Sequence, residues 1–352
     1  MKIEKTKFEA YVLNGIPEGC KRCIKGEKLV LFITGICPRK CNYCSLSEKR
    51  KDIDAIWANE RKCSSPKEVI EEAIESNATS ASITGGDPLS VLPRTIEYAK
   101  ALKNKFGKSF HIHIYLTPSL ANESSLKELS KCIDEVRFHP SFLTKDLPKE
   151  ENEKEKNIIK LASEIFGINN VGIELPLIPD KKQQILDYIK QTSTFIGFVN
   201  LNEFEISDTN FDFVTENYIL NEDGCRINGS KESGIWIINE LKKLNSKLKV
   251  NVCTAKTKLR YQYLNRLKLH NILPFGEKTS EGTVIYFVTP LTSENEQEIK
   301  KFNGYFIDKK KNRIIISKKL IEKLLKKTSL KITKVEEYPT FDGDEVLVQP
   351  IN

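Results

Sequence analysis

Residues 28–44 read KLVLFITGICPRKCNYC, a stretch that joins a short apolar run to three closely spaced cysteines. The run predicts a buried β-strand over Lys28–Thr34, because it is short and rich in β-branched and aromatic residues. Cys37, Cys41 and Cys44 follow it within eight residues. Three thiols this close can converge on one metal centre, and three thiolates leave a further position open for catalysis.

The composition is that of a globular protein, with 352 residues, 39% of them hydrophobic and 30% charged. The longest uncharged apolar run, Leu29–Cys37, is too short to span a bilayer, and Met1–Ala10 lacks a signal-peptide core. We therefore expect a cytoplasmic protein with no membrane partner. Nine cysteines, an odd number, argue against a disulfide framework in such a protein and favour metal or redox chemistry.

Outward from the first strand, short β-rich runs alternate with amphipathic helical patterns. We expect further strands over residues 79–83, 110–116, 133–138, 171–175, 196–201 and 247–253, and a loop over the charged residues 141–153. This alternation predicts parallel βαβ units and, with six or seven of them, an α/β fold of the partial (β/α)6 TIM-like barrel type. Functional residues of such a barrel lie at the carboxyl ends of its strands, here just after residues 34, 83, 116, 138, 175 and 201.

The pattern breaks at residues 271–283, where Pro, Gly and polar residues collect. We expect three parts, namely an N-terminal segment over 1–27, the barrel over 28–275 and a small α+β domain over 284–352. The last part is basic, since residues 300–334 hold thirteen Lys or Arg against two acids. These lysines can bind RNA phosphates, contact an acidic protein surface, or only solubilise a helix.

A second motif, TGGDPL over Thr84–Leu89, follows the second expected strand. Paired glycines let the backbone approach a ligand closely and expose its carbonyls. Alone, such a stretch would be an ordinary turn.

The two motifs together resemble the signature of the radical S-adenosylmethionine (SAM) superfamily. The C-x3-C-x2-C spacing carries an aromatic residue, Tyr43, before its last cysteine, and TGGDPL is similar to the GGEP-type motif with Asp87 in place of Glu. The resemblance spans residues 28–255, and its alternative is a zinc loop with a distant fourth ligand. When the upstream motif Glu18-Gly-Cys-x2-Cys is taken together with these two motifs, the sequence resembles an archaeal subgroup related to pyruvate formate-lyase activating enzymes.

The resemblance implies a [4Fe–4S] cluster on Cys37, Cys41 and Cys44, with SAM chelated to the fourth iron. One electron from a low-potential donor then cleaves SAM, and the 5′-deoxyadenosyl radical abstracts hydrogen from the substrate. It implies that Tyr43 packs near the adenine. The residues implied at the methionine amino group are Gly85, Gly86, Asp87 and Pro88.

Polar residues on the later strands are candidates for the remaining cofactor contacts, because a bound cofactor would supply partners for polar groups buried in a barrel. These candidates are His113, Arg137, Glu174, Asn200 and Asn202. For His113, which alternates with His111 and Tyr115, the alternative is a satisfied core histidine.

The remaining cysteines suggest a second metal site, containing zinc or a second iron–sulfur centre. Cys20 and Cys23 form a C-x2-C pair, and we expect the neighbouring basic side chains to lower their thiol pKa values. Cys253 and Cys225 are the distant ligands that can complete the site. The alternative is a set of free thiols.

We therefore expect a radical SAM enzyme acting on an unidentified substrate, with a preference for a macromolecule such as tRNA or protein because the last domain is basic. One alternative is a glycyl-radical enzyme activase, against which the basic extension counts, since known activases are compact. The other is a non-catalytic zinc or iron–sulfur protein that binds RNA.

Overall fold

The computed structural model describes residues 2–144 and 147–352, and its contacts divide the chain into two compact units. The first comprises Met1–Ile74 with Ala78–Tyr263, and the second comprises Glu75–Asn77 with Leu264–Asn352. This division falls earlier than the expected boundary at residues 275–284. Met1 of the expected N-terminal segment, and residues 145–146 of the expected loop, lie outside the described residues.

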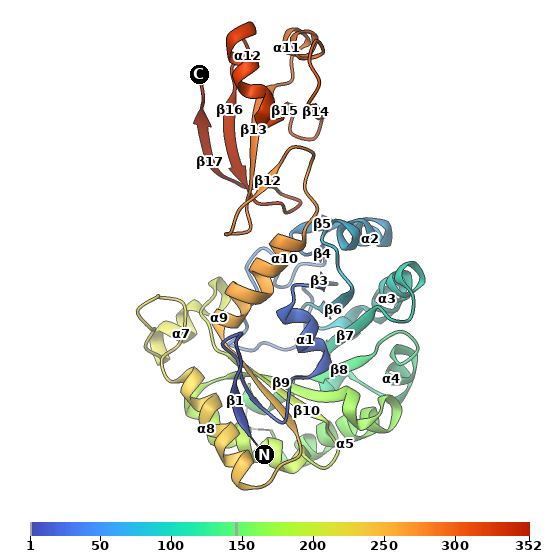
Figure 1. Cartoon of the computed structure of the whole chain (residues 1–352). Coiled ribbons are helices and arrows are strands. Elements are labelled where there is room, and N and C mark those ends of the chain that lie inside the picture. Colours follow the sequence, from blue (N-terminus) through green and yellow to red (C-terminus); the bar gives the residue numbers. More distant parts are fainter. Residues whose placement is uncertain (1, 145–146) are drawn as a thin grey trace. The chain divides into compact units, whose positions relative to one another are not determined.

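The first unit is built on an eleven-stranded sheet whose centre is parallel (Figure 1). Along the sheet, the parallel strands are β3 (Lys28–Phe32), β6 (Ser80–Thr84), β7 (His111–Leu116), β8 (Glu135–Phe138), β9 (Val171–Leu177), β10 (Phe198–Glu203) and β11 (Lys249–Cys253).

Short antiparallel strands extend this sheet at both ends. They are β4 (Ile56–Ala58) and β5 (Arg61–Cys63) beyond β3, and β2 (Tyr11–Leu13) and β1 (Ile3–Lys5) beyond β11. The described sheet therefore ends in two edge strands, β1 and β5, and does not close on itself. The expected partial barrel is confirmed, and the four flanking strands are additions that the sequence analysis did not include.

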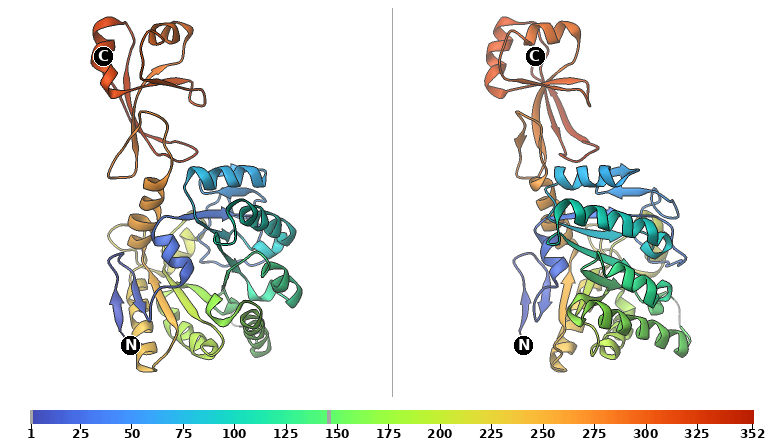
Figure 2. Two further views of the ribbon diagram at one scale, coloured as in Figure 1. Left: turned by 45° about the vertical axis from the view of Figure 1, so that its right-hand side comes forward. Right: turned by 90° about the vertical axis from the view of Figure 1, so that its right-hand side faces the viewer.

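Helices cover the outer face of the curved sheet (Figure 2). They are α2 (Pro66–Glu75), α3 (Leu92–Phe106), α4 (Glu123–Leu129), α5 (Lys149–Phe166), α6 (Lys182–Thr192), α7 (Phe211–Asn217) and α8 (Ser230–Lys243). Each long helix is amphipathic and buries one apolar stripe, as α6 does with Ile185, Leu186 and Ile189. No helix in residues 2–144 and 147–352 is long and apolar enough to cross a bilayer.

The expected loop over residues 141–153 is wrong in its second half, because α5 begins at Lys149. Pro148 takes the N-cap position, where its missing N–H costs nothing, and Glu150 and Glu151 occupy the first turn, where carboxylates favour a helix. The Lys and Glu residues that favoured a loop in the sequence are also good helix formers.

The inner face of the sheet is polar, which is unusual for a barrel core. Strand alternation places one residue in two on this face, and the register joins Tyr115 to Arg137, Glu174 to Asn200, and Asn200 to Asn251. Apolar residues of the same strands, such as Ile114 and Val136, point outward to the helices and are fully buried. The sheet therefore has its apolar core outside and a polar chamber inside.

A short helix, α1 (Glu18–Ile24), packs against this polar face. Its Gly19 N–H donates to Glu135 Oε2 at 3.0 Å. A Cβ on Gly19 would lie 2.4 Å from His113 Nδ1 and 2.5 Å from Arg137 Nη2, so any side chain here would force these buried groups to shift. The sequence analysis placed the Cys20–Cys23 pair in an N-terminal segment without recognising this helix, since seven residues give too little periodicity.

The second unit begins with α10 (Leu264–Leu269) and holds a six-stranded sheet with the order β14-β15-β13-β16-β17, in which β12 pairs with β13. Its strands are β12 (Glu277–Lys278), β13 (Val284–Pro290), β14 (Tyr305–Asp308), β15 (Arg313–Ile316), β16 (Thr333–Glu337) and β17 (Glu345–Pro350). The core of Ile314, Ile316 and Leu324 involves α12 (Ile321–Lys327), and α11 (Ser293–Ile299) adds Ile299. Arg313 is buried between Asp308 and Glu337, so one of the basic residues is a structural ion pair.

Replacing Gly19 with alanine should lower the free energy of unfolding by about 2 kcal/mol, because the methyl group would overlap side-chain ends that ion pairs hold in place. Urea denaturation followed by circular dichroism measures this. Lys21→Ala is the matched control on the same helix, since Lys21 makes only an exposed ion pair with Glu18 and its loss should cost under about 0.5 kcal/mol. Equal effects of the two substitutions would contradict the packing described for α1.

Candidate active site

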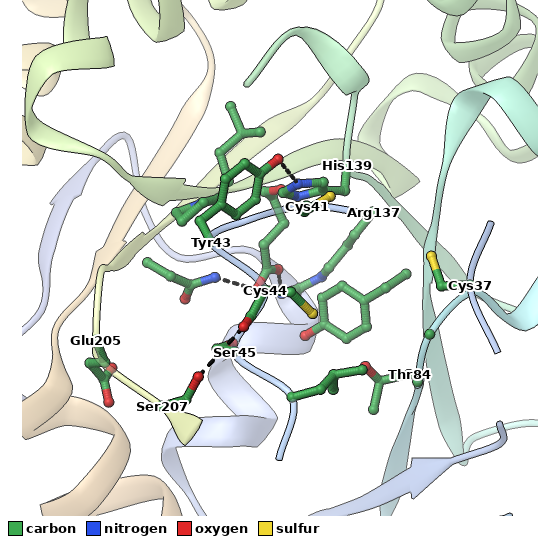
Figure 3. Close-up of a pocket in the computed structure, with 18 of the residues that line it drawn as sticks. Cys37, Cys41, Tyr43, Cys44, Ser45, Thr84, Arg137, His139, Glu205 and Ser207 are labelled. Atoms are coloured by element: carbon green, nitrogen blue, oxygen red, sulfur yellow. Dashed lines mark hydrogen bonds and ion pairs between the residues drawn. The ribbon is translucent and has the colours of Figure 1, made fainter. Parts of the chain in front are cut away.

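A cavity of about 610 Å³ opens at the carboxyl ends of the parallel strands (Figure 3). Its wall includes residues that follow each of six strands: Gly35 after β3, Gly85 after β6, Thr117 after β7, His139 after β8, Pro176 at the end of β9 and Phe204 after β10. Because parallel strands all present their carboxyl ends to one side, side chains far apart in the sequence meet here.

The three cysteines of the loop after β3 all line this cavity and are half-buried. Figure 3 shows the sulfurs of Cys37, Cys41 and Cys44 spread around the cavity. As they stand, no three His, Cys, Asp or Glu side chains of the described chain converge closely enough to hold a metal ion. Three thiols on one loop around one cavity nevertheless make the donor set that a soft metal or an iron–sulfur cluster takes, so the residues fit such a group.

Glycines bring the two motif loops together. The Gly86 N–H donates to Thr34 O at 2.7 Å, and the Asp87 N–H donates to Ile36 O at 2.9 Å. A Cβ on Gly85, whose φ is +151°, would lie 2.2 Å from Thr34 O, and one on Gly86 would lie 2.3 Å from Ile36 O. These glycines, which were expected to let the backbone approach a ligand, also permit close approach to the cysteine loop.

Asp87 joins this pair of loops to the next strand end. Its buried carboxylate accepts the Leu89 N–H through Oδ1 at 2.8 Å and the Thr117 N–H through Oδ2 at 2.8 Å. Burial raises the pKa of Asp87, although these hydrogen bonds oppose the shift. The side chain therefore braces the Gly-Gly loop, and the backbone of that loop is what faces the cavity.

Arg39 and Thr144 hold the first half of the cysteine loop. Arg39 donates to His139 O at 2.6 Å and to Thr144 Oγ1 at 2.8 Å, and Thr144 Oγ1 lies 3.3 Å from Cys41 Sγ. Since Thr144 already accepts from Arg39, its hydroxyl proton is available to Cys41 or to the nearby Tyr43.

Tyr43 is buried and packs beside His139 (Figure 3). Burial lowers the pKa of His139 to about 3, so its ring is neutral at physiological pH. His139 Nδ1 lies 3.0 Å from Glu174 O and must donate to that carbonyl, which leaves Nε2 to accept the Tyr43 hydroxyl at 2.9 Å. The aromatic residue of the cysteine motif is thus locked in one orientation.

The second half of the loop is tied to the segment after β10. Thr209 donates to Cys44 O at 2.8 Å, and Ser207 Oγ lies 3.5 Å from the same oxygen. These contacts hold the backbone at the last cysteine.

Arg137 is the charged centre of the chamber. It is fully buried, and it donates to Glu135 Oε1 and, at 2.7 Å, to Glu174 Oε2. Glu174 Oε1 in turn accepts from Asn202 Nδ2 at 2.8 Å. A buried guanidinium needs such paired carboxylates, and together they present an ordered set of polar groups to the cavity.

The cavity wall contains most of the residues singled out from the sequence. They are Cys20, Cys23, Cys37, Cys41, Tyr43, Cys44, Gly85, Gly86, Asp87, Arg137, Glu174, Asn200, Asn202 and Cys253. Three others lie elsewhere. Pro88 is buried at the start of a short 3-10 turn behind the wall, and Cys225 is exposed in a loop whose backbone is held by Asp223.

His113 lies beneath the wall and is fully buried. Its Nδ1 lies 2.6 Å from Lys28 Nζ and its Nε2 lies 3.1 Å from the Tyr115 hydroxyl. Tyr115, which lines the cavity, separates it from the open space. His113 therefore has the satisfied core environment that was the alternative to cofactor contact.

The expectation of lowered thiol pKa values is wrong for Cys20. Burial raises its pKa, and the nearby Arg137 offsets this only in part. Lys21, which was expected to act on it, points to solvent and pairs with Glu18. Burial also raises the pKa of Cys253 to about 12.

The sequence pattern did not single out five other residues of the wall, namely Arg39, Ser45, Glu205, Ser207 and Gln262. Tyr115 carried a signal, because it shares the inner-face alternation of its strand with His113. Lys258 and Gln262 stand four residues apart on a π-helical turn over Lys258–Tyr263. Such turns are frequent at functional sites, but the pattern of apolar residues reveals only a helix.

Replacing Gly85 with alanine should destabilise the protein by about 2–4 kcal/mol, because the new methyl group would force the two motif loops apart. Gly224→Ala is the control. Gly224 also has a positive φ, of +68°, but no atom lies within 4 Å of its would-be Cβ, so only the backbone cost of about 1–2 kcal/mol applies. Chemical denaturation measures both, and equal losses would rule out the steric explanation.

His113 should make stability sensitive to acid. Burial holds the pKa of His113 in the folded protein well below 6.5. Below pH 6.5, His113 is therefore protonated in the unfolded chain but stays neutral in the native state. Its contribution is complete above pH 6.5 and is lost as the pH falls below it. Between about pH 7.5 and about pH 5, urea denaturation should show a smaller loss of stability for His113→Gln than for the unaltered protein. A parallel pH dependence of the two proteins would show that His113 is protonated in the fold.

Comparison with known proteins bears directly on this site. The family model of the radical SAM superfamily matches residues 31–191. A protein of Methanocaldococcus jannaschii named "Putative glycyl-radical enzyme activating enzyme" is 38% identical over 293 residues, which cover 81% of this chain and 76% of that one.

Two solved structures are also similar. The coproporphyrinogen III oxidase HemN of Escherichia coli, a radical SAM enzyme, is 13% identical, with a TM-score of 0.38 over 66% of this chain and 56% of that chain. The radical SAM methyltransferase TsrM of Kitasatospora setae is 10% identical, with a TM-score of 0.37 over 76% of this chain and 58% of that one. The match to the family model, with the extent and identity of the archaeal match, shows that the chain belongs to the radical SAM superfamily of enzymes, whose cofactors are a [4Fe–4S] cluster and SAM.

Proposed function

We propose that this radical SAM enzyme activates a partner protein by removing a hydrogen atom from the α-carbon of a glycine. The 38% identity to the archaeal protein named as an activating enzyme, over 81% of this chain, carries the proposal. Of the two macromolecular substrates that were expected, tRNA and protein, this identity favours protein. The comparisons give no support to tRNA, which we do not propose.

The basic extension, which counted against an activase, lies in the second unit, of which the relative shares at least the beginning. The second unit runs from Leu264 to Asn352, which is a quarter of the chain, whereas only about a fifth of the chain lies outside the match. A contiguous match must therefore enter the second unit, so the relative shares at least part of it.

In this proposal Cys37, Cys41 and Cys44 are the ligands of the cluster. Supporting this, their loop is held on both sides, by Arg39 and Thr144 before the last cysteine and by Thr209 after it. When bound, the reduced cluster and SAM supply a 5′-deoxyadenosyl radical.

The chain's own groups then bind and orient SAM. We assign the methionine amino group to the Gly85–Asp87 backbone and the adenine to Tyr43, whose ring His139 holds in place. Arg137, Glu174, Asn200 and Asn202 offer donors and acceptors for the ribose and the carboxylate. The walls also exclude water, which protects a radical from side reactions.

The overall reaction balances with one electron. With cluster and SAM bound, an electron from the donor would break the C–S bond of SAM and release methionine. A C–H bond of the glycine breaks as the new C–H bond of 5′-deoxyadenosine forms, and the unpaired electron remains on the glycine α-carbon.

The test is anaerobic incubation of the reconstituted enzyme with SAM, dithionite and a glycine-containing peptide that carries deuterium on the glycine α-carbon. We expect 5′-deoxyadenosine that contains deuterium. Cys41→Ala should lower its yield by at least about 100-fold, because the cluster loses a ligand. Cys63→Ala is the control, since Cys63 lies outside the cavity wall.

Two outcomes separate the parts of the account. Cleavage of SAM that Cys41→Ala leaves unchanged would overturn the assignment of the cluster ligands. Cleavage without any deuterium transfer from a peptide, and without an EPR doublet of a glycyl radical, would overturn the activase proposal.

A further inference from the structure

Three cysteines outside the C-x3-C-x2-C loop line the same cavity. Cys20 and Cys23 stand three residues apart on α1, a spacing that puts both on one face of a helix. Cys253 ends β11, directly beside Asn202 of β10 in the sheet register. Elements from the two ends of the first unit thus place three thiols on one wall.

Burial favours the protonated form of Cys20 and Cys253 in the metal-free chain, but both sulfurs have nitrogen donors of the kind that stabilise metal-bound thiolates. Arg137 Nη2 lies 3.4 Å from Cys20 Sγ, and Gln262 Nε2 lies 3.2 Å from Cys253 Sγ, so each sulfur accepts an N–H hydrogen bond. A thiol sulfur is a weak acceptor. Donors aimed at sulfur are the outer partners that orient thiolate ligands and stabilise their charge. Cys20 also reaches Asn200 Oδ1 at 3.5 Å, a contact that its S–H makes only while protonated.

We propose that Cys20, Cys23 and Cys253 form a second metal centre, separate from the catalytic cluster, that binds a thiophilic metal as zinc or as an iron–sulfur cluster. Three thiolates leave one position on the metal open toward the cavity, where a substrate group or a nearby side chain can bind. This centre is independent of the activase proposal, because it requires no particular substrate. Cys225, which the sequence analysis included, takes no part, since it is exposed and outside the wall.

The sulfurs do not yet converge, but neither do those of Cys37, Cys41 and Cys44, on a loop whose spacing is the superfamily's cluster signature. In both groups, rotation about the Cα–Cβ bonds moves the sulfurs without moving the backbone. Lack of convergence therefore does not distinguish the second group from the first.

The test is metal analysis of a full-length background in which Cys37, Cys41 and Cys44 are all replaced with alanine. Any thiolate-bound metal that remains cannot belong to the catalytic cluster. We expect either about one zinc per chain or a retained iron–sulfur absorption after reconstitution with iron and sulfide. The zinc and iron contents of the protein show which of these two metal centres is present.

In that background, Cys20→Ser and Cys253→Ser should each lower the metal content at least about tenfold, whereas Cys225→Ser should leave it unchanged. Cys23→Ser, at a less buried position, serves if a buried substitution prevents folding, which circular dichroism detects. If the folded background protein contained neither zinc nor iron, the proposal would be overturned. Metal that remained in both the Cys20→Ser and the Cys253→Ser variants would overturn it as well.

Discussion

Everything at this site depends on the close approach of two backbone segments that only glycine permits. The strand pairing of β3 with β6 continues past the strand ends, through the bonds from Gly86 to Thr34 and from Asp87 to Ile36. Any side chain at Gly85 or Gly86 would overlap a carbonyl oxygen of the facing segment. As a result, the cysteine loop and the Gly-Gly loop leave the sheet side by side and line one cavity.

The second constraint is the polar interior, which is costly unless every group in it has a partner. Arg137 satisfies two carboxylates from its own and the neighbouring strand, and one of these, Glu135, also accepts the backbone of α1. Removing one member of such a buried ion pair typically costs about 3–5 kcal/mol, because its partner stays buried and unpaired. The polar chamber is therefore rigid, as a site that orients a cofactor for radical chemistry requires.

Much of this arrangement could be read from the sequence, for identifiable physical reasons. Short β-rich runs that alternate with helical patterns made β3, β6, β7 and β8 evident, and the cysteine spacing placed the site at the end of the first. The edge strands β4 and β5 and the helix α1 were not, because elements of three to seven residues carry no usable periodicity. The position of a residue along a strand also did not show how far it lies below the cavity. His113 was therefore expected to contact the cofactor, as Arg137 was, although Tyr115 separates it from the cavity.

The interactions that hold the cysteine loop were beyond sequence reasoning. Arg39 belongs to the cysteine loop, but Thr144 and Thr209 come from two other loops, and nothing in their local sequences links them to one another or to the cysteines. Contacts of this kind depend on where the strands deliver each loop. These contacts depend on the order of the strands in the sheet, which the local sequence pattern specifies only indirectly.

The central claim is that the two glycine-braced loops form one site for a cluster and SAM together. Electron paramagnetic resonance of the reduced, reconstituted protein tests it most directly, because a cofactor bound to the open iron alters the electronic structure of the cluster. The account predicts that adding SAM changes the cluster spectrum, and that SAM labelled with ¹⁵N at the amino group shows hyperfine coupling to the cluster. A spectrum that is identical with and without SAM would contradict the account.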